Sequence, residues 1–491
     1  MWSDLEQQLR ELAEAYGQQH IFKYWDQLDK EQRCRFLDDL SRVDFPLMRR
    51  LAETWILNTP DPEHFSDIRP IPVIPPDPVD AGAKDAGEEA LSRGEVGLFL
   101  VAGGQGTRLG FPGPKGCYPI GPITGKTLFQ YHAEKIRGLQ RRYGCELPWY
   151  IMVSEANEAA TRAYFADNHW LGLRPEQVVF LKQRMVPCMD AQGRFLLEAP
   201  DRLAMNPNGH GGCIPAMKEE GVIQHARERG VRWLSYFQVD NWAVKVADPV
   251  FLGHHILRNA DMSSKVHRKN DPREAVGVHC LCDGDYRVIE YSELDLYPQL
   301  LETDETGALR FFAGNPAIHI ISVDFAERLN AHYQDFPWHV AHKKVPCLDE
   351  SGALVKPDRP NAYKFETFVF DALRFVSHPP VALEIRREGE YTPTKQPEGV
   401  NSVAASRQSM SDYWGGWLEK AGWSLPKTPD GHVAVPVEIS PAFALTEDEL
   451  IKQAPAPVPV GGGVAIDEDG RVTVVTECPA SCGAAEPAIK E

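Results

Sequence analysis

Short apolar runs alternate with helical segments from Val96 onward, and this alternation limits the possible folds more than any other feature of the sequence. The apolar runs are VGLFLVA, PWYIMVS, QVVFLKQ and RWLSYFQVD, and segments such as TLFQYHAEKIRGLQRRY and KEEGVIQHARER lie between them. The pattern is typical of βαβ units around a mostly parallel sheet. We therefore expect an α/β fold, a Rossmann-like doubly wound mixed sheet with binding loops at the carboxyl ends of its strands.

The segments on either side of this central part have other residue patterns. Apolar positions three and four residues apart between Leu5 and Leu57 predict a helical N-terminal unit, and the proline-rich stretch Ile68 to Asp80 predicts an extended strap. The turn CDGDY predicts a hairpin added to the sheet. We expect a helical unit with its linker over residues 1–88, a catalytic domain over 89–396, and a small C-terminal α/β or β domain over 397–491 that ends in a flexible tail.

Charge and cysteine usage restrict the partners and the compartment. The net charge of −18 repels nucleic-acid backbones, so we expect no nucleic-acid partner. The N-terminus lacks the features of a secretory signal, and no stretch has the length and apolarity of a membrane helix. The ten cysteines lack zinc-site spacing and are interpreted as reduced thiols of a cytoplasmic protein. The sequence leaves monomer and homo-oligomer equally open.

A glycine-rich loop follows the first apolar run, in VGLFLVAGGQGTRLGFPGPKGCYPI. Its glycines allow the backbone to approach a ligand and to turn N–H groups toward an anion, although a plain strand-to-loop turn would also use them. The spacing fits neither a Walker loop nor a dinucleotide fingerprint. Arg108 and Lys115 lie in the same loop, and two cations beside free N–H groups favour a triphosphate.

Several motifs in a fixed order then support a family resemblance. They are AGGQGTRLGFPGPKG, QRMVPCMD, NPNGHGG, YFQVDNWAVKVADP, VGVHCLCDGDYRVIEYSEL, FFAGNPAIHI, HVAHKKVPCLDESGALVKPDRPNAYKFETFVFDAL and LEIRREGEYTPTK. From about residue 96 to about 396 the chain resembles the eukaryotic-type UDP-N-acetylglucosamine pyrophosphorylases. The resemblance implies a GT-A-like nucleotidyltransferase that uses Mg²⁺ and makes UDP-N-acetylglucosamine and pyrophosphate from UTP and N-acetylglucosamine 1-phosphate.

The resemblance also implies residues for the nucleotide. The residues implied for uracil are Val101, Ala102, Gly103, Gly104, Gln183 and Gly209. Taken without the resemblance, Gln183 is more simply interpreted as a surface loop residue near the end of the run VVFLK. Asp240 closes the run WLSYFQVD and is implied as the Mg²⁺ ligand, with Asn241 in support; the residues alone also fit a capping pair. Arg108, Lys115 and Lys364 are the cations implied in catalysis.

A second set is implied for the sugar 1-phosphate. Its members are His210, Glu290, Tyr291, Gly314, Asn315 and Lys364, and Lys343 and Lys344 are further candidates near the phosphates. Taken alone, the same residues fit a β-turn, an ordinary strand face and solvated lysines. The implied reaction is a single in-line displacement at the α-phosphorus of UTP with no covalent protein intermediate, so catalysis rests on positioning and charge stabilisation.

His210 departs from the pattern of the family. The N-acetylglucosamine enzymes have Asn after the glycine that matches Gly209, whereas UDP-glucose and broad-specificity UDP-sugar pyrophosphorylases have Gly-His-Gly there, as in GHGG here. UDP-glucose, UDP-galactose or mixed specificity is therefore the alternative to UDP-N-acetylglucosamine. A non-catalytic UDP-sugar sensor is a hypothesis of another class, and it would be expected to lack one of the cations or Asp240. A kinase or dehydrogenase would need motifs that the sequence does not contain.

Overall fold

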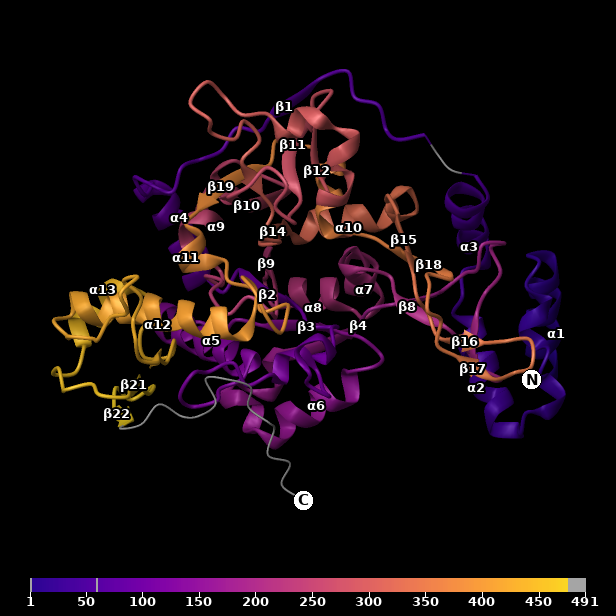
Figure 1. Cartoon of the computed structure of the whole chain (residues 1–491), viewed down its shortest axis with the longest axis horizontal. Helices are drawn as coiled ribbons and strands as arrows, with labels where there is room; N and C mark the ends of the chain where they lie inside the picture. The colour runs from indigo at the N-terminus through magenta and orange to yellow at the C-terminus, as the bar shows by residue number, and fades with distance from the viewer. Residues whose placement is uncertain (1, 59–60, 476–491) are drawn as a thin grey trace. The chain divides into compact units, whose positions relative to one another are not determined.

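The computed structural model describes residues 2–58 and 61–475 and divides into two compact units (Figure 1). The helical unit comprises Met1–Phe65, Gln183–Ala216 and His332–Ala372. The sheet unit comprises Ser66–Lys182, Met217–Ala331 and Leu373–Glu491. These units cut across the ranges 1–88, 89–396 and 397–491 expected from the sequence, so that three-part division stays a prediction.

The sheet unit is built on one mixed sheet of 11 strands. Along the sheet the strands are β1 (Ile68–Pro70), β11 (Val278–Cys282), β13 (Ala313–Gly314), β10 (Met262–Arg268), β14 (His319–Ser322), β9 (Trp233–Gln238), β2 (Val96–Val101), β3 (Trp149–Val153) and β4 (Val178–Lys182), while β12 (Asp285–Ile289) pairs with β11 and β19 (Val381–Ile385) with β10. β9, β2, β3 and β4 are mutually parallel, whereas β14 is antiparallel to β9. The expected α/β class and the mixed sheet are confirmed.

Helices and a small C-terminal sheet complete this unit. The helices are α4 (Ala81–Ser92), α5 (Leu128–Tyr143), α6 (Glu158–Asp167), α7 (Cys213–Glu219), which begins in the helical unit, α8 (Val222–Glu228), α9 (Pro249–Leu257), α10 (Val323–Ala331), α11 (Arg387–Glu390), α12 (Val403–Lys420) and α13 (Glu447–Gln453). The small sheet has the order β20 (Val437–Ile439), β21 (Gly463–Ile466) and β22 (Val472–Val475). The β element expected near the C-terminus is therefore present, and the expected tail from residue 476 lies outside the described residues.

Local sequence explains why the first crossover of the sheet forms as it does. β2 is almost wholly buried because its side chains are apolar on both faces, as expected for a strand covered on two sides. α5 begins after Thr127, whose hydroxyl accepts a hydrogen bond from Gln130 N in a capping box, and it ends at Gly144 in the left-handed region. Tyr131 of α5 stacks on Trp414 of α12 at 5.7 Å, so C-terminal residues share this core. Figure 1 shows α12 beside α5.

Several local expectations can be compared with the structure. The hairpin at CDGDY is confirmed, since β11 and β12 pair and Asp283 and Gly284 both have positive φ in the turn. The proline-rich stretch is extended, as expected, with Ile74 bridging Leu383. The helical segment KEEGVIQHARER is broken at Gly221, where the left-handed backbone separates α7 from α8.

The helical unit combines N-terminal helices with short strand pairs from distant parts of the chain. Its elements are α1 (Trp2–Ala15), α2 (Lys30–Ser41), α3 (Phe45–Ala52), the 3₁₀ turns Gln19–Phe22, Trp25–Gln27 and His210–Gly212, the π turn Glu53–Leu57, and the pairs β5 (Met185–Pro187) with β8 (Met205–Pro207), β6 (Leu197–Ala199) with β7 (Arg202–Leu203), β15 (His339–Lys343) with β18 (Ala362–Glu366), and β16 (Cys347–Leu348) with β17 (Leu354–Val355). The helical N-terminus is confirmed, with 3₁₀ turns at Phe22 and Trp25. Phe36 and Phe45 share a core with Phe195 and Phe365.

Two further expectations concern membranes and thiols. Among the helices of the described residues, none combines the length and apolarity needed to cross a membrane. All eight cysteines of the described residues are free thiols. Cys280 and Cys282 share a thiol hydrogen bond with 3.6 Å between their sulfur atoms and form no disulfide. Cys478 and Cys482 lie outside the described residues.

Candidate nucleotide site

The glycine-rich loop leaves the end of β2 and is held by the turn that precedes α6. Asn157 donates its side-chain amide to the carbonyl of Ala102 at 2.8 Å, and the Ser154 hydroxyl donates to the carbonyl of Gly103 at 2.8 Å. In the part of the chain that the structure describes, the backbone N–H groups of Gly103 and Gly104 donate to no protein acceptor. Fixed carbonyls and unused N–H groups make this turn suited to an anion.

The rest of the loop folds back on itself and presents two cations. The amide of Lys115 donates to the carbonyl of Gly104 at 3.1 Å, and that of Gly106 donates to Gly113 at 2.8 Å, so the two arms of the loop are tied together. The Arg108 side chain is exposed and pairs with no carboxylate in residues 2–58 and 61–475. The loop therefore keeps one cation exposed to solvent and anchors the other at its base.

Lys115 and Asp240 form the ion pair at the centre of this site. β2 and β9 are parallel neighbours, with Val101 opposite Gln238, so their carboxyl ends lie at the same edge of the sheet. The Nζ atom of Lys115 lies 2.9 Å from Oδ2 of Asp240, and both side chains are largely buried. The structure thus brings together a loop cation and the strand-end carboxylate that the sequence predicted separately.

The surroundings of Asp240 keep its carboxylate charged. Burial would raise the pKa of Asp240, but the positive charges of Lys115 and Lys395 and the hydrogen bond from Lys115 together lower it. In the described part of the chain, Oδ1 of Asp240 takes no hydrogen bond, since Lys115 bonds Oδ2 alone. Asp240 is therefore a charged carboxylate with one oxygen that accepts no hydrogen bond from the described residues.

Lys395 is a residue of this site that the sequence reasoning did not single out. Burial would lower its pKa, but the nearby Asp240, Tyr391, Glu290 and Tyr291 raise it. Lys395 is half-buried, and its charge interacts with Asp240 of the nucleotide set and with Glu290 and Tyr291 of the sugar set. The available signal was its place at the end of LEIRREGEYTPTK, one of the segments that carry the family resemblance.

Asn241 forms hydrogen bonds to the segment that precedes Lys395 in the chain. Its side-chain amide donates to the carbonyl of Glu390 at 2.7 Å and its oxygen accepts from the amide of Thr392 at 3.0 Å. The amide of Thr394 then donates to the carbonyl of Asp240 at 2.9 Å. Asn241 thus holds the chain that leads to Lys395 beside Asp240.

The predicted sugar residues of the sheet unit lie around one glycine. The amide of Asn315 donates to the carbonyl of Gly277 at 2.9 Å, and a Cβ at Gly277 would lie 2.8 Å from Oε1 of Glu290. Gly314 pairs with strands on both sides, β10 and β11. Tyr291 is 50% exposed. Glu290, Gly314 and Asn315 are therefore brought together, with Tyr291 at the surface beside them.

In the helical unit, Gln183 and Gly209 lie together. The side-chain amide of Gln183 donates to the carbonyl of Gly209. Gly209 has φ of +81°, and a Cβ there would lie 2.3 Å from the carbonyl oxygen of Thr367. Glycine is required at this position both by the backbone conformation and by the close approach of Thr367.

His210 packs in a stack of rings. Its ring lies on Phe368 with centroids 5.2 Å apart and planes at 19°, and its Nδ1 accepts a hydrogen bond from the amide of Val369 at 3.2 Å. His339 stacks on Phe368 at 4.2 Å and bonds Asp371 at 2.8 Å through Nε2. An acceptor at Nδ1 means that a neutral His210 carries its proton on Nε2.

The predicted lysines of the helical unit lie on the ribbon of β15 and β18. Lys364 is opposite Ala341 and Lys343 is opposite Ala362, so Lys364 and Lys343 share one face of the ribbon. Lys364 is half-buried, whereas Lys343 and Lys344 are exposed, and Lys344 lies beyond the end of β15. The binding roles assigned to the residues of both units stay predictions.

The residues that could hold Mg²⁺ are few. Within the described ranges, no group of three or more His, Cys, Asp and Glu side chains could hold a metal ion. Asp240 offers a charged carboxylate with one oxygen that takes no hydrogen bond from the described residues. Mg²⁺ commonly binds one or two carboxylates together with substrate phosphates, so Asp240 fits that mode, with phosphate oxygens as further ligands.

A mixed α/β sheet, an anion-binding loop and a lysine–aspartate pair at the carboxyl edge define a nucleotide-binding enzyme of the α/β class. Residues 60–410 match the protein family described as "UTP--glucose-1-phosphate uridylyltransferase". The chain belongs to this family and is a nucleotidyltransferase of the UDP-sugar pyrophosphorylase type.

Individual relatives cover most of the chain. It is 35% identical to "UDP-N-acetylhexosamine pyrophosphorylase-like protein 1" of Homo sapiens, over 91% of this chain and 94% of that protein. It is 35% identical to "UDP-N-acetylglucosamine pyrophosphorylase" of Saccharomyces cerevisiae, over 83% of this chain and 90% of that protein. The crystal structure of the uridine diphosphate N-acetylglucosamine pyrophosphorylase from Trypanosoma brucei in complex with inhibitor is similar with a TM-score of 0.74 and 26% identity, over 91% of this chain and 94% of that one.

Proposed function

We propose that the protein transfers the uridylyl group of UTP to N-acetylglucosamine 1-phosphate, giving UDP-N-acetylglucosamine and pyrophosphate. The observation that carries this proposal is the Lys115–Asp240 pair at 2.9 Å in the same site as the amides of Gly103 and Gly104, which donate to no acceptor among the described residues. This arrangement offers a cation, N–H donors and a metal-binding carboxylate to a single triphosphate. The choice of sugar is supported by the yeast relative named for N-acetylglucosamine and by the segments around IEYSEL.

The chemistry needs no nucleophile from the protein. An oxygen of the sugar 1-phosphate forms a bond to the α-phosphorus of UTP, and the bond from that phosphorus to the pyrophosphate oxygen breaks. Arg108 and Lys115 neutralise charge that moves onto the phosphates, and Lys395 lies on the side of Glu290 and Tyr291. Lys364 is a further proposed phosphate contact. The protein thus contributes positioning and charge.

Mg²⁺ is the proposed metal, with Asp240 as its protein ligand. When bound, it would neutralise phosphate charge and orient the triphosphate. Asp240 suits this role because its lowered pKa keeps it charged at neutral pH. Lys115 holds Oδ2 and would remain a fixed neighbour of the phosphates.

The test is a panel of sugar 1-phosphates with UTP and Mg²⁺, with pyrophosphate release as the measurement. We expect N-acetylglucosamine 1-phosphate to give the highest kcat/KM. Equal or better use of glucose 1-phosphate would overturn this choice of sugar. Absence of pyrophosphate release with every sugar would overturn uridylyl transfer itself.

UDP-glucose, UDP-galactose or mixed specificity is the second candidate. His210 in GHGG favours it, and so does the description of the matching family, which names glucose 1-phosphate. A non-catalytic UDP-sugar-binding protein is disfavoured because Arg108, Lys115 and Asp240 are all present. Tight binding of UDP-sugar without exchange of labelled pyrophosphate would support that reading instead.

We propose the cytoplasm as the location of the protein. The eight cysteines of the described residues are free thiols, which is typical of a reducing compartment. Fractionation of cells with an antibody to the full chain would test this location, and recovery in a secretory fraction would contradict it.

A further inference from the structure

The position of Lys395 depends on a short stretch of chain without regular structure. α11 ends at Glu390, and the next residues up to Lys395 form no helix or extended strand. Yet Lys395 follows Thr394, whose amide donates to the carbonyl of Asp240 at 2.9 Å, and its charge interacts with the Asp240 carboxylate. In the proposed reaction, a shift of about an ångström in such a cation would change its contact with a phosphate. One antiparallel bridge, between Asn241 and Pro393, ties this segment to the residues just after β9, so side-chain contacts must supply the rest of the restraint.

The fixed point is the buried carboxylate of Glu390. Glu390 is 6% exposed, and both of its oxygens are held by lysines. Oε2 accepts from Lys265, and Oε1 lies 3.1 Å from Nζ of Lys245. Lys265 is fully buried and also donates to Asp248 at 2.6 Å. A carboxylate bound at both oxygens by two lysines has little freedom to move.

The two lysines come from the sheet side of the site. Lys265 lies on β10, and Lys245 follows β9 and Asp240 in the chain. His267, two residues after Lys265 on the same face of β10, stacks on Tyr391 with centroids 4.7 Å apart and planes at 19°. Alternate side chains of one strand therefore hold Glu390 and Tyr391, the first two residues of the segment.

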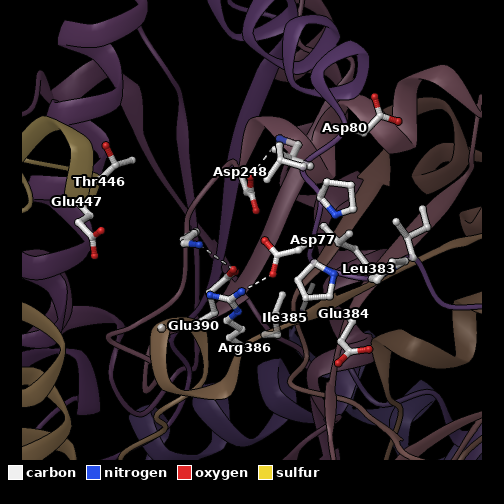
Figure 2. Close-up of a pocket in the computed structure, with 18 of the residues that line it drawn as sticks. Asp77, Asp80, Asp248, Leu383, Glu384, Ile385, Arg386, Glu390, Thr446 and Glu447 are labelled. Atoms are coloured by element: carbon white, nitrogen blue, oxygen red, sulfur yellow. Dashed lines mark hydrogen bonds and ion pairs between the residues drawn. The ribbon is translucent and has the colours of Figure 1, made fainter. Parts of the chain in front are cut away.

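On one side, Glu390 borders a cavity, so packed side chains alone do not hold it there. A cavity of about 950 Å³ is lined by Glu390 together with Lys245, Asp248 and Arg386. Figure 2 shows Glu390 and Asp248 on the wall of this cavity, away from the labelled residues Thr446 and Glu447. Where a cavity replaces packed side chains, the ion pairs of Glu390 provide the restraint.

We propose that Glu390 is a positioning residue for uridylyl transfer, which through Lys265 and Lys245 fixes the segment that presents Lys395 beside Asp240. The proposal rests on the proposed function. All the contacts that connect Glu390 with Asp240 lie within the sheet unit. The side-chain amide of Asn241 donates to the carbonyl of Glu390, and the amide of Thr394 donates to the carbonyl of Asp240. Glu390 itself need not touch substrate.

The first measurement compares Glu390→Gln with a matched control. Glutamine keeps the shape of the side chain and removes the charge that holds both lysines. We expect kcat to fall about 10-fold to 100-fold, with a smaller change in the KM for UTP, because displacement of a group near the reacting phosphates acts mainly on turnover. The control is Glu384→Gln, which removes a carboxylate paired with the exposed Arg268 and should leave kcat within about 3-fold of wild type.

The second measurement separates positioning from a general structural effect. Lys395→Ala is made in the wild-type and Glu390→Gln backgrounds, and kcat is measured for the cycle. If Glu390 acts through Lys395, the double variant is no slower than Lys395→Ala alone. Multiplication of the two losses, or near-normal kcat in folded Glu390→Gln, overturns the proposal.

The third measurement is independent of turnover. Hydrogen exchange of the full chain should show faster exchange in peptides covering residues 390–396 of Glu390→Gln, with peptides of β2 and β9 unchanged. A chain without uridylyl transfer but with this exchange pattern refutes the proposed function and leaves the restraint of the segment intact. Unchanged exchange at 390–396 refutes the restraint. If Glu390→Gln fails to fold, Lys265→Met/Glu390→Gln also removes the buried lysine charge that Glu390 no longer balances, and failure of that variant too would show a role in the whole fold and overturn the proposal.

Discussion

Nζ of Lys115 lies 2.9 Å from Oδ2 of Asp240, although the two residues are 125 positions apart in the chain. The pair forms because β2 and β9 are parallel neighbours whose carboxyl ends meet at one edge of the sheet. Lys115 lowers the pKa of Asp240 against the effect of burial. Lys115 therefore supplies a positive charge for the proposed triphosphate and keeps Asp240 charged for the proposed Mg²⁺.

Lys115→Ala should abolish most of the activity without unfolding the protein. We expect kcat to fall about 10²–10³-fold, the effect typical of removing one group that stabilises developing charge. The pKa of Asp240 should also rise, since burial then acts with less opposition. Steady-state pyrophosphate release measures kcat, and a circular dichroism melt shows whether the variant is folded. Lys84→Ala, at an exposed lysine, is the control, and near-normal turnover of Lys115→Ala would contradict the proposed role.

Buried histidines should make the protein less stable below about pH 6.5. Burial lowers the pKa of His132, His255 and His279 to about 3 and that of His267 to about 4, from an ordinary value of 6.5. In the unfolded chain they take up protons as the pH falls through 6.5, while the folded protein keeps them neutral. Stability is therefore full above that pH and declines below it, by about 1.4 kcal/mol per pH unit for each histidine until its folded pKa is reached.

Urea unfolding at pH 7.0 and 5.5 measures this slope. His279→Leu should reduce the loss between the two pH values by about 1.4 kcal/mol, the share of one histidine. His64→Leu, at an exposed position, should leave the loss unchanged. Equal pH dependence of wild type and His279→Leu would show that His279 is not held neutral in the folded protein.

Gly209→Ala should destabilise the protein more than a turn glycine with open surroundings. Gly209 has φ of +81° and would place a Cβ 2.3 Å from the Thr367 carbonyl oxygen, whereas Gly230 has φ of +73° and no atom within 4 Å of such a Cβ. Gly230→Ala should cost about 1–2 kcal/mol through backbone strain alone. Gly209→Ala should cost about 1–3 kcal/mol more, because the backbone of Thr367 must move. Chemical denaturation measures both, and equal costs would contradict the close approach.

His210→Asn should shift the choice of sugar toward N-acetylglucosamine 1-phosphate. Asparagine cannot stack on Phe368, and it is the residue that the sequence resemblance associates with N-acetylglucosamine. We expect the ratio of kcat/KM for N-acetylglucosamine 1-phosphate over glucose 1-phosphate to rise about 10-fold, a difference of about 1.4 kcal/mol.

His339→Asn shows whether this effect passes through the ring stack. His339 lies on Phe368 at 4.2 Å, so its loss should shift selectivity in the same direction if the position of Phe368 matters. A shift with His210→Asn alone would assign the effect to His210 itself. An unchanged ratio in both variants would remove His210 from the choice of sugar.

Local pattern was sufficient for much of the sheet and part of the site. The apolar runs predicted β2, β3, β4 and β9 because strands covered on both faces need apolar side chains at every position. The same runs placed the glycine-rich loop and Asp240 at strand ends. The hairpin turn was predictable because Asp-Gly accepts the positive φ that it requires.

The sequence by itself determined the parallel strands β2, β3, β4 and β9, the helical N-terminus and the loop that can receive an anion. Only the tertiary structure decided that the N-terminal helices share a core with Phe195 and Phe365, because an apolar helix face does not specify the surface that covers it. It also decided that the segment leading to Lys395 is bonded to the backbone of Asp240 and that Glu390 is held by Lys265 and Lys245. These relationships join residues that are far apart in the chain. They depend on the order of the strands in the sheet and on the pairing of buried charges, and the local spacing of residues encodes neither the strand order nor the pairing.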